Sequence, residues 1–522
     1  MFAHKDLRIY RSDGLLHDLH SVSPDGAALF PSPFKAQIMQ LDSMRSSSPA
    51  TSSGDRVMGN IIASPLTFEL VETAVNALQL ESDRVPKGNK ADTLRLAIDQ
   101  TLQSRLDRGI FRRLCASEDR NLVDFSSNDF LSLATNETLK QDFLRCLSIE
   151  KEPILGASGS RLLIPAPHHV ALEARISRIW MTPNGAVSSL AFATGYAANV
   201  ALWSTLPQHR DIVLYDELVH ASVHDGIRMG RVGRGTALAV SFPHNDLGVL
   251  RPLLEEEIAR DRRGFQPRTV FVAVESLYSM DGDTAPLVEI IRLLKPLGSR
   301  AKLIVDEAHA VGVFNRGLSM PPYLTPAESA KVFARTVTFG KALGVAGAAL
   351  IVPEYVKSYL INYARPFVFS TAPAVFNILA VDCTLTALED GRASELALQL
   401  QRNIQFLIRR LREQLAKVPH SIAMLPETVA ATTGNGELSP IIPVLTAQPH
   451  ALSAHLRTYF QTVARPIAWP TVPKGRERVR ICVTAGHSLA ELEGLAIGVG
   501  DWVRSVGTDS AFTALMTSRA KL

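Results

Sequence analysis

Seven short apolar runs, rich in β-branched side chains, place the strongest constraint on how this chain folds. Runs of four to seven residues suit buried strands. Helical patterns lie between them, for example 247–260 and 286–297, and the second begins at Pro286 and is followed by Gly298. Strands that alternate with helices predict an α/β domain whose mainly parallel sheet is covered on both faces. The seven runs are residues 189–194, 211–215, 236–242, 269–274, 302–305, 335–339 and 347–352.

The pattern changes after the seventh run, where helices become long and strands sparse. Helices are predicted at 373–390, 395–418 and 488–504, and strands at 440–445 and 478–483. We therefore predict a large α/β domain over 181–372 and a smaller α+β domain over 373–510. Residues 91–180 are predicted to form an N-terminal helical or small-domain segment.

Residues 1–90 differ in composition from the rest. The run 46–54, SSSPATSSG, is of low complexity and cannot build a core. We predict a mobile N-terminal extension. A mitochondrial presequence is the alternative, although Asp6, Asp13 and Asp18 are unusual in such acid-poor segments.

The last residues, 511–522, read as a tail. The chain finishes with Ala520-Lys521-Leu522, a variant of the S-K-L peroxisomal address. We therefore predict a peroxisomal location, with the cytoplasm and the mitochondrion as alternatives.

Composition excludes several classes of protein. Fifty-five Lys and Arg against fifty-one Asp and Glu leave a net charge of only +4, and no basic tract indicates a nucleic-acid partner. The four cysteines, Cys115, Cys146, Cys383 and Cys482, show no CxxC spacing, so neither a zinc site nor a disulfide framework is predicted. No uninterrupted apolar run reaches eighteen residues, so no transmembrane helix is predicted.

Polar, titratable residues follow nearly every predicted strand. In open α/β sheets, functional residues collect in the loops at the carboxyl ends of the strands. The sequence therefore predicts one convergent active site. The segments that follow the strands are 195–196, 216–220, 275–283, 306–309 and 340–341.

Two of these residues suggest pyridoxal chemistry. Lys341 lies between small residues, and a partly desolvated lysine has a lowered pKa and forms Schiff bases. Asp306 ends an apolar strand, where a buried carboxylate needs a partner such as a pyridinium N–H. His309, three residues on, can reach the same ring. Taken singly, these short motifs are weak; DEAH also occurs in helicases.

The order of nine motifs closely resembles the α-oxoamine synthases. These are fold-type-I pyridoxal-phosphate enzymes that condense an amino acid with an acyl thioester and lose CO2. The resemblance extends from about residue 92 to 504. The motifs are FSSNDFLSL (125–133), GASGSR (156–161), ATGYAAN (193–199), DELVHASVHDG (216–226), ESLYSMDGD (275–283), VDEAHAVGV (305–313), TFGKALG (338–344), FSTA (369–372) and PTVPKGRERVRI (470–481).

The resemblance implies roles around the cofactor ring. Lys341 matches the Schiff-base lysine that also moves the proton at the substrate α-carbon. Asp306 matches the partner of the pyridine nitrogen, and His220 the imidazole that stacks on the ring. His309 and Ser279 match the hydrogen-bond partners of the ring O3′.

It implies phosphate-binding residues as well. Gly195 and Tyr196 match the turn whose backbone amides hold the phosphate at a helix N-terminus, and Thr338 adds a hydroxyl. Ser370 and Thr371 match a pair contributed by the other subunit, so the resemblance implies a homodimer with shared sites.

A third group is expected at the substrate. Asn128 and Arg480 match groups near the substrate carboxylate, which suits an Arg–carboxylate fork, and we assign Arg112 to the same group. Arg478 is expected to be structural.

One segment departs from the family pattern. After Ser160-Arg161 the chain continues LLIPAPHH (162–169), one residue shorter than usual and with two prolines that fix φ. We expect this loop, which lies near the acyl-thioester entrance in the family, to run differently and to affect the choice of acyl donor.

Within the family, Ser160-Arg161 favours the members that join L-alanine to a pimeloyl thioester in biotin biosynthesis. The first alternative is a related synthase that uses a longer acyl-CoA or a polyketide thioester. The second is a non-catalytic subunit of a heterodimer, but such subunits lose the lysine that Lys341 supplies here. A nucleotide-binding loop at GASGS is disfavoured because no clear strand precedes it.

Overall fold

A computed structural model describes residues 92–108, 110–112, 114, 121–180, 187–317, 324–430 and 436–508. The predicted extension over 1–90 and the tail that carries Ala520-Lys521-Leu522 lie outside these described residues. The chain divides into an N-terminal unit, Leu15–Arg112, and a unit that holds the remainder. The described part of the first unit is helix α3 (Thr93–Asp107), which Asp92 caps by accepting from the backbone N–H of Leu94 and Arg95.

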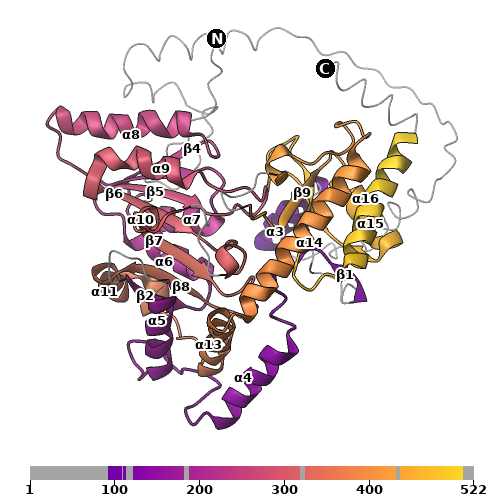
Figure 1. The fold of residues 1–522 in the computed structure, drawn as a ribbon. Helices are drawn as coiled ribbons and strands as arrows, with labels where there is room; N and C mark the ends of the chain where they lie inside the picture. Colours follow the sequence, from indigo (N-terminus) through magenta and orange to yellow (C-terminus); the bar gives the residue numbers. More distant parts are fainter. Residues whose placement is uncertain are drawn as a thin grey trace, which may run out of the picture. The chain divides into compact units, whose positions relative to one another are not determined.

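The centre of the large unit is a seven-stranded sheet in the order β2-β8-β7-β6-β5-β3-β4 (Figure 1). Strands β7, β6, β5, β3 and β4 are parallel, and β8 runs antiparallel to both of its neighbours. Its strands are β2 (Val187–Phe192), β3 (Ile212–Asp216), β4 (Leu238–Phe242), β5 (Val270–Glu275), β6 (Ala301–Asp306), β7 (Val332–Thr338) and β8 (Ala348–Pro353). All seven predicted strands are therefore confirmed, and so is the mainly parallel α/β sheet.

Alternate residues of the strands pack on opposite faces. In β3, Val213 and Tyr215 join one apolar cluster while Ile212 and Leu214 join another. Helices cover both clusters, which explains why the strands read as continuous apolar runs. The first cluster lies under α6 (Gly195–Thr205), α7 (Ala221–Met229), α11 (Glu354–Tyr363) and α12 (Arg365–Val368), and the second under α8 (Leu247–Arg262) and α9 (Leu287–Leu294).

One predicted helix was too long. The expected helix over 286–297 ends as α-helix at Leu294 and continues as the 3-10 turn Lys295–Arg300. Pro296 lacks the N–H that an α-helix needs, and Gly298 takes a left-handed conformation at φ 57°. The remaining short helices of this part are 3-10 turn Asn315–Gly317 and α10 (Pro326–Ser329).

The C-terminal part packs three helices against a small antiparallel sheet in the order β11-β12-β9. Strand β1, near the start of the described chain, pairs in parallel with β10, so Val123 lies opposite Thr462. Segments from both ends of the chain therefore build this part. Its elements are β1 (Val123–Asp124), α14 (Arg392–Leu415), the 3-10 turn Glu427–Ala430, β9 (Ile441–Leu445), α15 (Pro449–Phe460), β10 (Thr462–Val463), β11 (Arg465–Ile467), β12 (Arg478–Cys482) and α16 (Leu489–Thr508).

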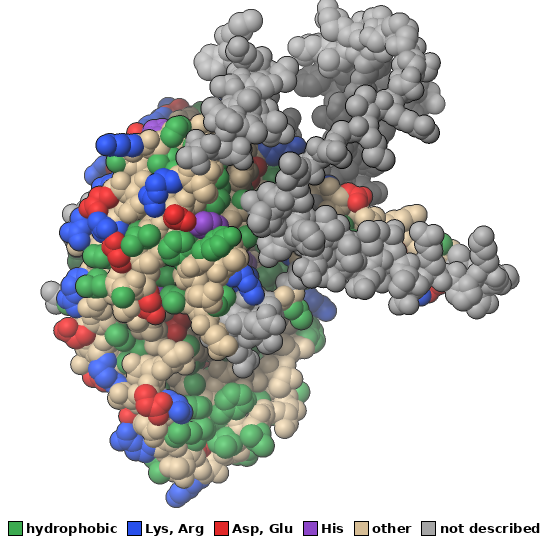
Figure 2. All heavy atoms as spheres, turned by 90° about the vertical axis from the view of Figure 1, so that its right-hand side faces the viewer, with side chains coloured by type: hydrophobic (Ala, Val, Ile, Leu, Met, Phe, Trp, Pro, Cys, Tyr) green, Lys and Arg blue, Asp and Glu red, His purple; other side chains and the backbone are tan. Residues whose placement is uncertain are grey.

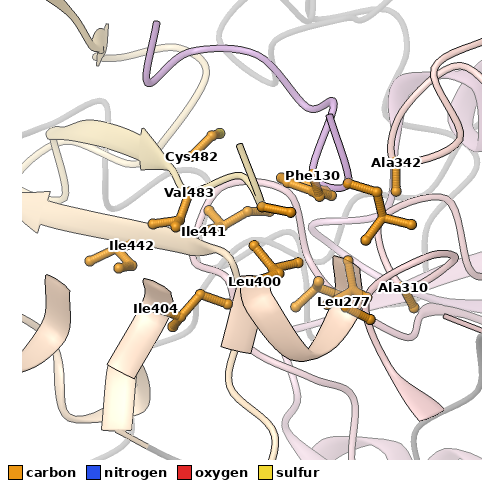
Figure 3. Close-up of a cluster of buried hydrophobic side chains, with 14 of the residues drawn as sticks. Phe130, Leu277, Ala310, Ala342, Leu400, Ile404, Ile441, Ile442, Cys482 and Val483 are labelled. Atoms are coloured by element: carbon orange, nitrogen blue, oxygen red, sulfur yellow. The ribbon is translucent and has the colours of Figure 1, made fainter. Parts of the chain in front are cut away.

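Three further helices connect the two parts along the chain, α4 (Glu137–Ile149), α5 (Pro167–Ile179) and α13 (Val375–Glu389). A large apolar core joins them to the C-terminal part. Figure 3 shows Leu400 and Ile404 of α14 and Ile441 of β9 beside Leu277, Ala310 and Ala342, which follow β5, β6 and β7. Burial of these neighbours fixes the loops at the sheet's carboxyl edge.

No described helix combines the length and apolar character needed to cross a membrane. On the face drawn in Figure 2, acidic and basic side chains are interspersed with hydrophobic ones. Within the described residues, Cys146, Cys383 and Cys482 are free thiols.

Candidate active site

The carboxyl ends of β5, β6 and β7 bring together the residues predicted for pyridoxal chemistry. Glu275 and Asp306 are the last residues of neighbouring strands and lie side by side in the register. Lys341 follows β7, and His309 follows β6. Leu277, Ala310 and Ala342 anchor the loops that carry these side chains, because each is fully or almost fully buried in the core.

Asp306 is held by donors on both carboxylate oxygens. Its Oδ2 accepts from Asn199 Nδ2 at 2.7 Å, and its Oδ1 accepts from the backbone N–H of Ala308 at 2.9 Å. Both donors fix a carboxylate that is only 9% exposed at the end of an apolar strand. These hydrogen bonds replace bonds to water that the buried carboxylate loses.

His220 is the N-cap of α7. Its Nδ1 lies 3.2 Å from the backbone N of Ser222, and Tyr196 approaches the ring edge-on with centroids 6.5 Å apart. The ring is partly exposed, yet the surrounding atoms remove enough water to lower its pKa. Lys341 lowers the pKa further, while Asp306 opposes the change.

Loss of water also changes the other titratable groups of the site. Burial lowers the pKa of Lys341, with Arg480 acting in the same direction and Asp306 and Glu275 against it. Burial raises the pKa of Glu275 well above its ordinary range, and the nearby Asp306 adds to this. A lysine with a lowered pKa has an amine available for bonding to carbonyl carbon and for proton transfer.

His309 is buried, and its Nδ1 has no hydrogen-bond partner among the described residues. Burial and the charge of Lys341 lower its pKa well below the ordinary value. Phe130 packs against the ring with centroids 6.1 Å apart. A buried nitrogen without a partner costs free energy unless a bound group satisfies it.

The N-terminus of α6 lies beside β7. Thr194 caps the helix by accepting from the backbone N–H of Ala197. Gly195 opens the helix, and a Cβ there would lie 3.6 Å from Thr338 Oγ1. Backbone N–H groups at a helix N-terminus, joined by a threonine hydroxyl, suit a phosphate group.

Arginine side chains from β12 reach across to the loop after β5. Arg480 donates from Nε to the Ser279 carbonyl at 2.5 Å and from Nη2 to Asn128 Oδ1 at 2.9 Å. Arg478 is 1% exposed and pairs with Asp281 at 2.7 Å. The structure thus places Asn128, Ser279 and Arg480 together and gives Arg478 a structural contact. Ser279 also lines a cavity of about 140 Å³ with Tyr278 and Val472.

His244 also contacts the loop after β5, through Asp283. Its Nδ1 lies 3.0 Å from Asp216 Oδ1 and its Nε2 lies 2.8 Å from Asp283 Oδ2. Burial alone would lower the pKa of His244, but hydrogen bonds to Asp216 and Asp283 outweigh it and raise the pKa to about 10. The ring also meets Tyr278 edge-on at 4.4 Å.

Three predicted residues are not brought into this cluster. Ser370 and Thr371 follow α12 and are exposed, and the Ser370 hydroxyl donates to the Pro366 carbonyl. Arg112 is exposed and belongs to the N-terminal unit, so its assignment to the substrate stays a prediction.

Sequence reasoning missed Asn199, Ser222, Glu275 and His244 as individual site residues. Asn199 and Ser222 stand inside motifs already recognised, and both are almost fully buried. The available signal was a polar residue on the apolar face of a helix, which requires a buried partner.

Comparisons with known proteins identify the family of this chain. The sequence profile of aminotransferase class I and II matches residues 120–497. An 8-amino-7-oxononanoate synthase of Emericella nidulans is 36% identical over 432 residues, which cover 81% of this chain and 99% of the relative. The chain belongs to the α-oxoamine synthases, within the aminotransferase class I and II family.

Other α-oxoamine synthase relatives differ in their names. An aminoacyl transferase sphA of Aspergillus fumigatus is 31% identical over 398 residues, 74% of this chain and 81% of the relative. The structure of serine palmitoyltransferase from Sphingomonas wittichii matches in fold with a TM-score of 0.60 at 23% identity, covering 85% of this chain and 99% of that one. The protein is thus a pyridoxal-phosphate-dependent acyltransferase of fold type I. The alternative of a non-catalytic subunit is set aside.

The residues of this α-oxoamine synthase fit pyridoxal phosphate. Asp306 offers a fixed carboxylate for a pyridinium N–H, and the unpaired Nδ1 of His309 is a buried atom that a ring substituent can satisfy. The α6 N-terminus at Gly195, with Thr338, can hold the phosphate, and the Lys341 amine can bond to the aldehyde carbon.

Proposed function

We propose that this α-oxoamine synthase condenses L-alanine with pimeloyl-CoA, releasing CO2 and CoA and forming 8-amino-7-oxononanoate for biotin biosynthesis. The observation that carries the proposal is the similarity to the synthase of Emericella nidulans over 99% of that protein's length. The Ser160-Arg161 pair of the GASGSR motif supports the same choice.

The arrangement of side chains supports this chemistry. Bound pyridoxal phosphate supplies an electron sink that stabilises negative charge at the amino acid's α-carbon. We assign the substrate carboxylate to Arg480, an assignment supported by its bonds to Asn128 and the Ser279 carbonyl. Lys341, with its lowered pKa, takes the α-proton and later returns one. The Asp306 carboxylate would stabilise the protonated pyridine nitrogen, whose positive charge draws electrons away from the substrate α-carbon.

A matrix of substrates tests the proposal. Purified enzyme is assayed with alanine, serine and glycine, each against pimeloyl-CoA, succinyl-CoA and palmitoyl-CoA. We expect the highest kcat/KM for alanine with pimeloyl-CoA. A higher value for palmitoyl-CoA, or for serine, would contradict the proposed substrates while leaving the enzyme class intact.

A longer acyl chain is the second candidate. It is favoured by the similarity to the aminoacyl transferase sphA and by the exposed Leu162 and Leu163, which precede Pro165 and Pro167 at the predicted acyl entrance. The palmitoyl-CoA column of the same matrix decides between the two candidates. Exchange of Leu163 for Asp should then lower kcat/KM for palmitoyl-CoA more than for pimeloyl-CoA.

We also propose a homodimer with shared active sites. Ser370 and Thr371 are exposed beside Phe369, which is 71% exposed, and Leu163, which is 80% exposed, stands on a neighbouring loop. That loop is tied to this segment by the bond from Ala372 N to the Gly159 carbonyl at 3.0 Å. In the test, Lys341→Ala and Thr371→Ala protomers are mixed and re-associated. Activity above that of either variant alone is expected, and a fully active monomer in sedimentation would contradict the dimer.

Peroxisomal import is proposed from Ala520-Lys521-Leu522. The supporting argument is that β-oxidation of longer acyl chains in peroxisomes can produce a pimeloyl thioester. The test follows a fluorescent protein fused to the N-terminus, with and without the three residues. Loss of the peroxisomal pattern on deletion is expected, and identical distributions would contradict the address.

A further inference from the structure

Four buried polar side chains from four elements form a continuous hydrogen-bonded chain that ends at His220. Thr336 of β7, Asn199 of α6, Asp306 of β6 and Ser222 of α7 are each no more than 9% exposed. Thr336 Oγ1 lies 2.8 Å from Asn199 Oδ1, and Asn199 Nδ2 lies 2.7 Å from Asp306 Oδ2 and 3.0 Å from Ser222 Oγ. The last link joins Ser222 Oγ to His220 Nδ1 at 2.8 Å.

The position of each hydrogen in this chain follows from the chemistry of the groups. The Asp306 carboxylate only accepts, so the atom of Asn199 that faces it must be the NH2 group. The second N–H of that group then points to Ser222 Oγ, and the Asn199 carbonyl accepts from the Thr336 hydroxyl. Every donor and acceptor of the Asn199 amide is therefore used.

The same accounting fixes the state of His220. The backbone N–H of Ser222 points to His220 Nδ1 at 3.2 Å, so Nδ1 acts as an acceptor. The hydrogen between Nδ1 and Ser222 Oγ, 2.8 Å apart, therefore belongs to the hydroxyl, which accepts from Asn199 as well. A protonated Nδ1 would face that N–H directly, which is repulsive. Because His220 caps α7, the positive end of the helix dipole opposes a charged ring as well.

The surrounding charges do not reverse this preference. Loss of water and Lys341 oppose a charged His220, whereas Asp306 and Asp225 favour it, and the net result is a lowered pKa. Glu275, another carboxyl group at this turn, accepts from the His220 backbone.

We infer that Asn199 and Ser222 are positioning residues that join Asp306 to His220 and hold the His220 ring neutral, with its proton on Nε2. The ring then presents a hydrogen-bond donor at Nε2. One amide thus fixes both the carboxylate for the pyridine nitrogen and, through Ser222, the imidazole predicted to stack on the same ring.

The inference is tested by NMR of 15N-histidine-labelled holoenzyme, with the His220 signals identified by their loss in His220→Asn. Wild-type protein should show a protonated Nε2 and an unprotonated Nδ1. Ser222→Ala should raise the titration midpoint of His220 by about one pH unit, because it removes a donor to the neutral ring. Ser222→Thr keeps the hydroxyl and should restore the wild-type midpoint.

Ser189→Ala is the matched control. Like Ser222, Ser189 is fully buried. It lies in β2 and donates one hydrogen bond, to the Glu173 carbonyl, outside the hydrogen-bonded chain that ends at His220. It should leave His220 unchanged. Asn199→Ala should shift the His220 midpoint and also weaken pyridoxal-phosphate affinity about tenfold, since Asp306 loses a charge-assisted bond.

Two results would overturn the inference. One is a wild-type His220 with its proton on Nδ1, a measurement that needs only the His220→Asn variant for assignment of the signals. The other is a Ser222→Ala protein whose His220 titrates like that of Ser189→Ala. None of these measurements depends on the identity of the acyl donor, so failure of the alanine–pimeloyl proposal would leave them unchanged.

Discussion

His220 and His244 follow neighbouring strands at the same edge of the sheet, but the structure favours a neutral ring at His220 and a positively charged ring at His244. Two donors from Ser222 point at His220 Nδ1, and its pKa is lowered. Two carboxylates face the nitrogens of His244, and its pKa is raised to about 10. Burial lowers the pKa of both rings; at His220 it remains the largest contribution, whereas at His244 the hydrogen bonds and charges of the two carboxylates outweigh it.

The two environments suit different tasks. The neutral ring of His220 offers a hydrogen-bond donor at Nε2. The charged ring of His244 links Asp216, which precedes the His220 turn, to Asp283 in the loop that carries Ser279. We therefore expect substitutions of His220 to change activity and substitutions of His244 to change stability.

The largest expected effect is that of His220→Asn on turnover. Asparagine can still cap α7, so the helix should keep its start. Loss of the imidazole should lower kcat by about 10³-fold, within the range for removing one preorganised hydrogen-bond donor, while the free energy of unfolding changes by less than about 1 kcal/mol. Steady-state kinetics and urea unfolding measure both. A loss of several kcal/mol in the free energy of unfolding, alongside the loss of kcat, would contradict the contrast between the two histidines.

His244→Gln should reverse that pattern. It leaves Asp216 and Asp283 without their cation, and removing one partner of a buried charge cluster costs about 3 kcal/mol of stability. Activity at low temperature should fall much less than in His220→Asn. His455→Gln is the control, because His455 meets the half-exposed Asp501 and should cost under about 1 kcal/mol. A His244→Gln enzyme as stable as this control would show that the contacts of His244 with Asp216 and Asp283 do not stabilise the fold.

The pH dependence of stability sharpens the comparison. The folded-state pKa of His244, about 10, lies above its unfolded value of about 6.5. Its contribution is therefore fully present below pH 6.5 and is lost as pH rises toward 10. Urea unfolding between pH 6 and 10 should show a steeper loss for wild type than for His244→Gln. Parallel curves would show that His244 titrates equally in both states.

The smallest expected effect is that of Asp283→Asn. The amide keeps the shape of the site and removes one of the two negative charges at His244, so about 1 kcal/mol should be lost at pH 7. The remaining bond to Asp216 should still keep the His244 pKa above its ordinary value, and the loss of stability should be complete at lower pH than in wild type. Histidine NMR titration measures this shift. A His244 pKa equal to that of wild type would show that the charge of Asp283 does not stabilise the charged His244 ring.

The strands could be predicted because most of them are buried on both faces and read as apolar runs of four to seven residues. The end of α9 could not be placed, since Pro296 ends the α-helix while a 3-10 turn carries the apolar pattern onward. Lys341, Asp306 and His309 could be assigned to one site because parallel strands end at one edge. The charge of His244 could not, because Asp216 and Asp283, its partners, come from different strand ends.

The pairing of β1 with β10 has a consequence for the order of events during synthesis. Val123 and Thr462 are 339 positions apart, so β1 leaves the ribosome roughly 20–70 s before its partner is made, at 5–20 residues per second. Asn128 is likewise synthesised before its partner Arg480, by a similar interval. A nascent chain that stops before β12 therefore lacks Arg480, and we expect it to expose an apolar flank where the residues of β12 would pack. Chaperone binding should concentrate on such stalled chains, and a separately supplied C-terminal fragment should compete for that flank.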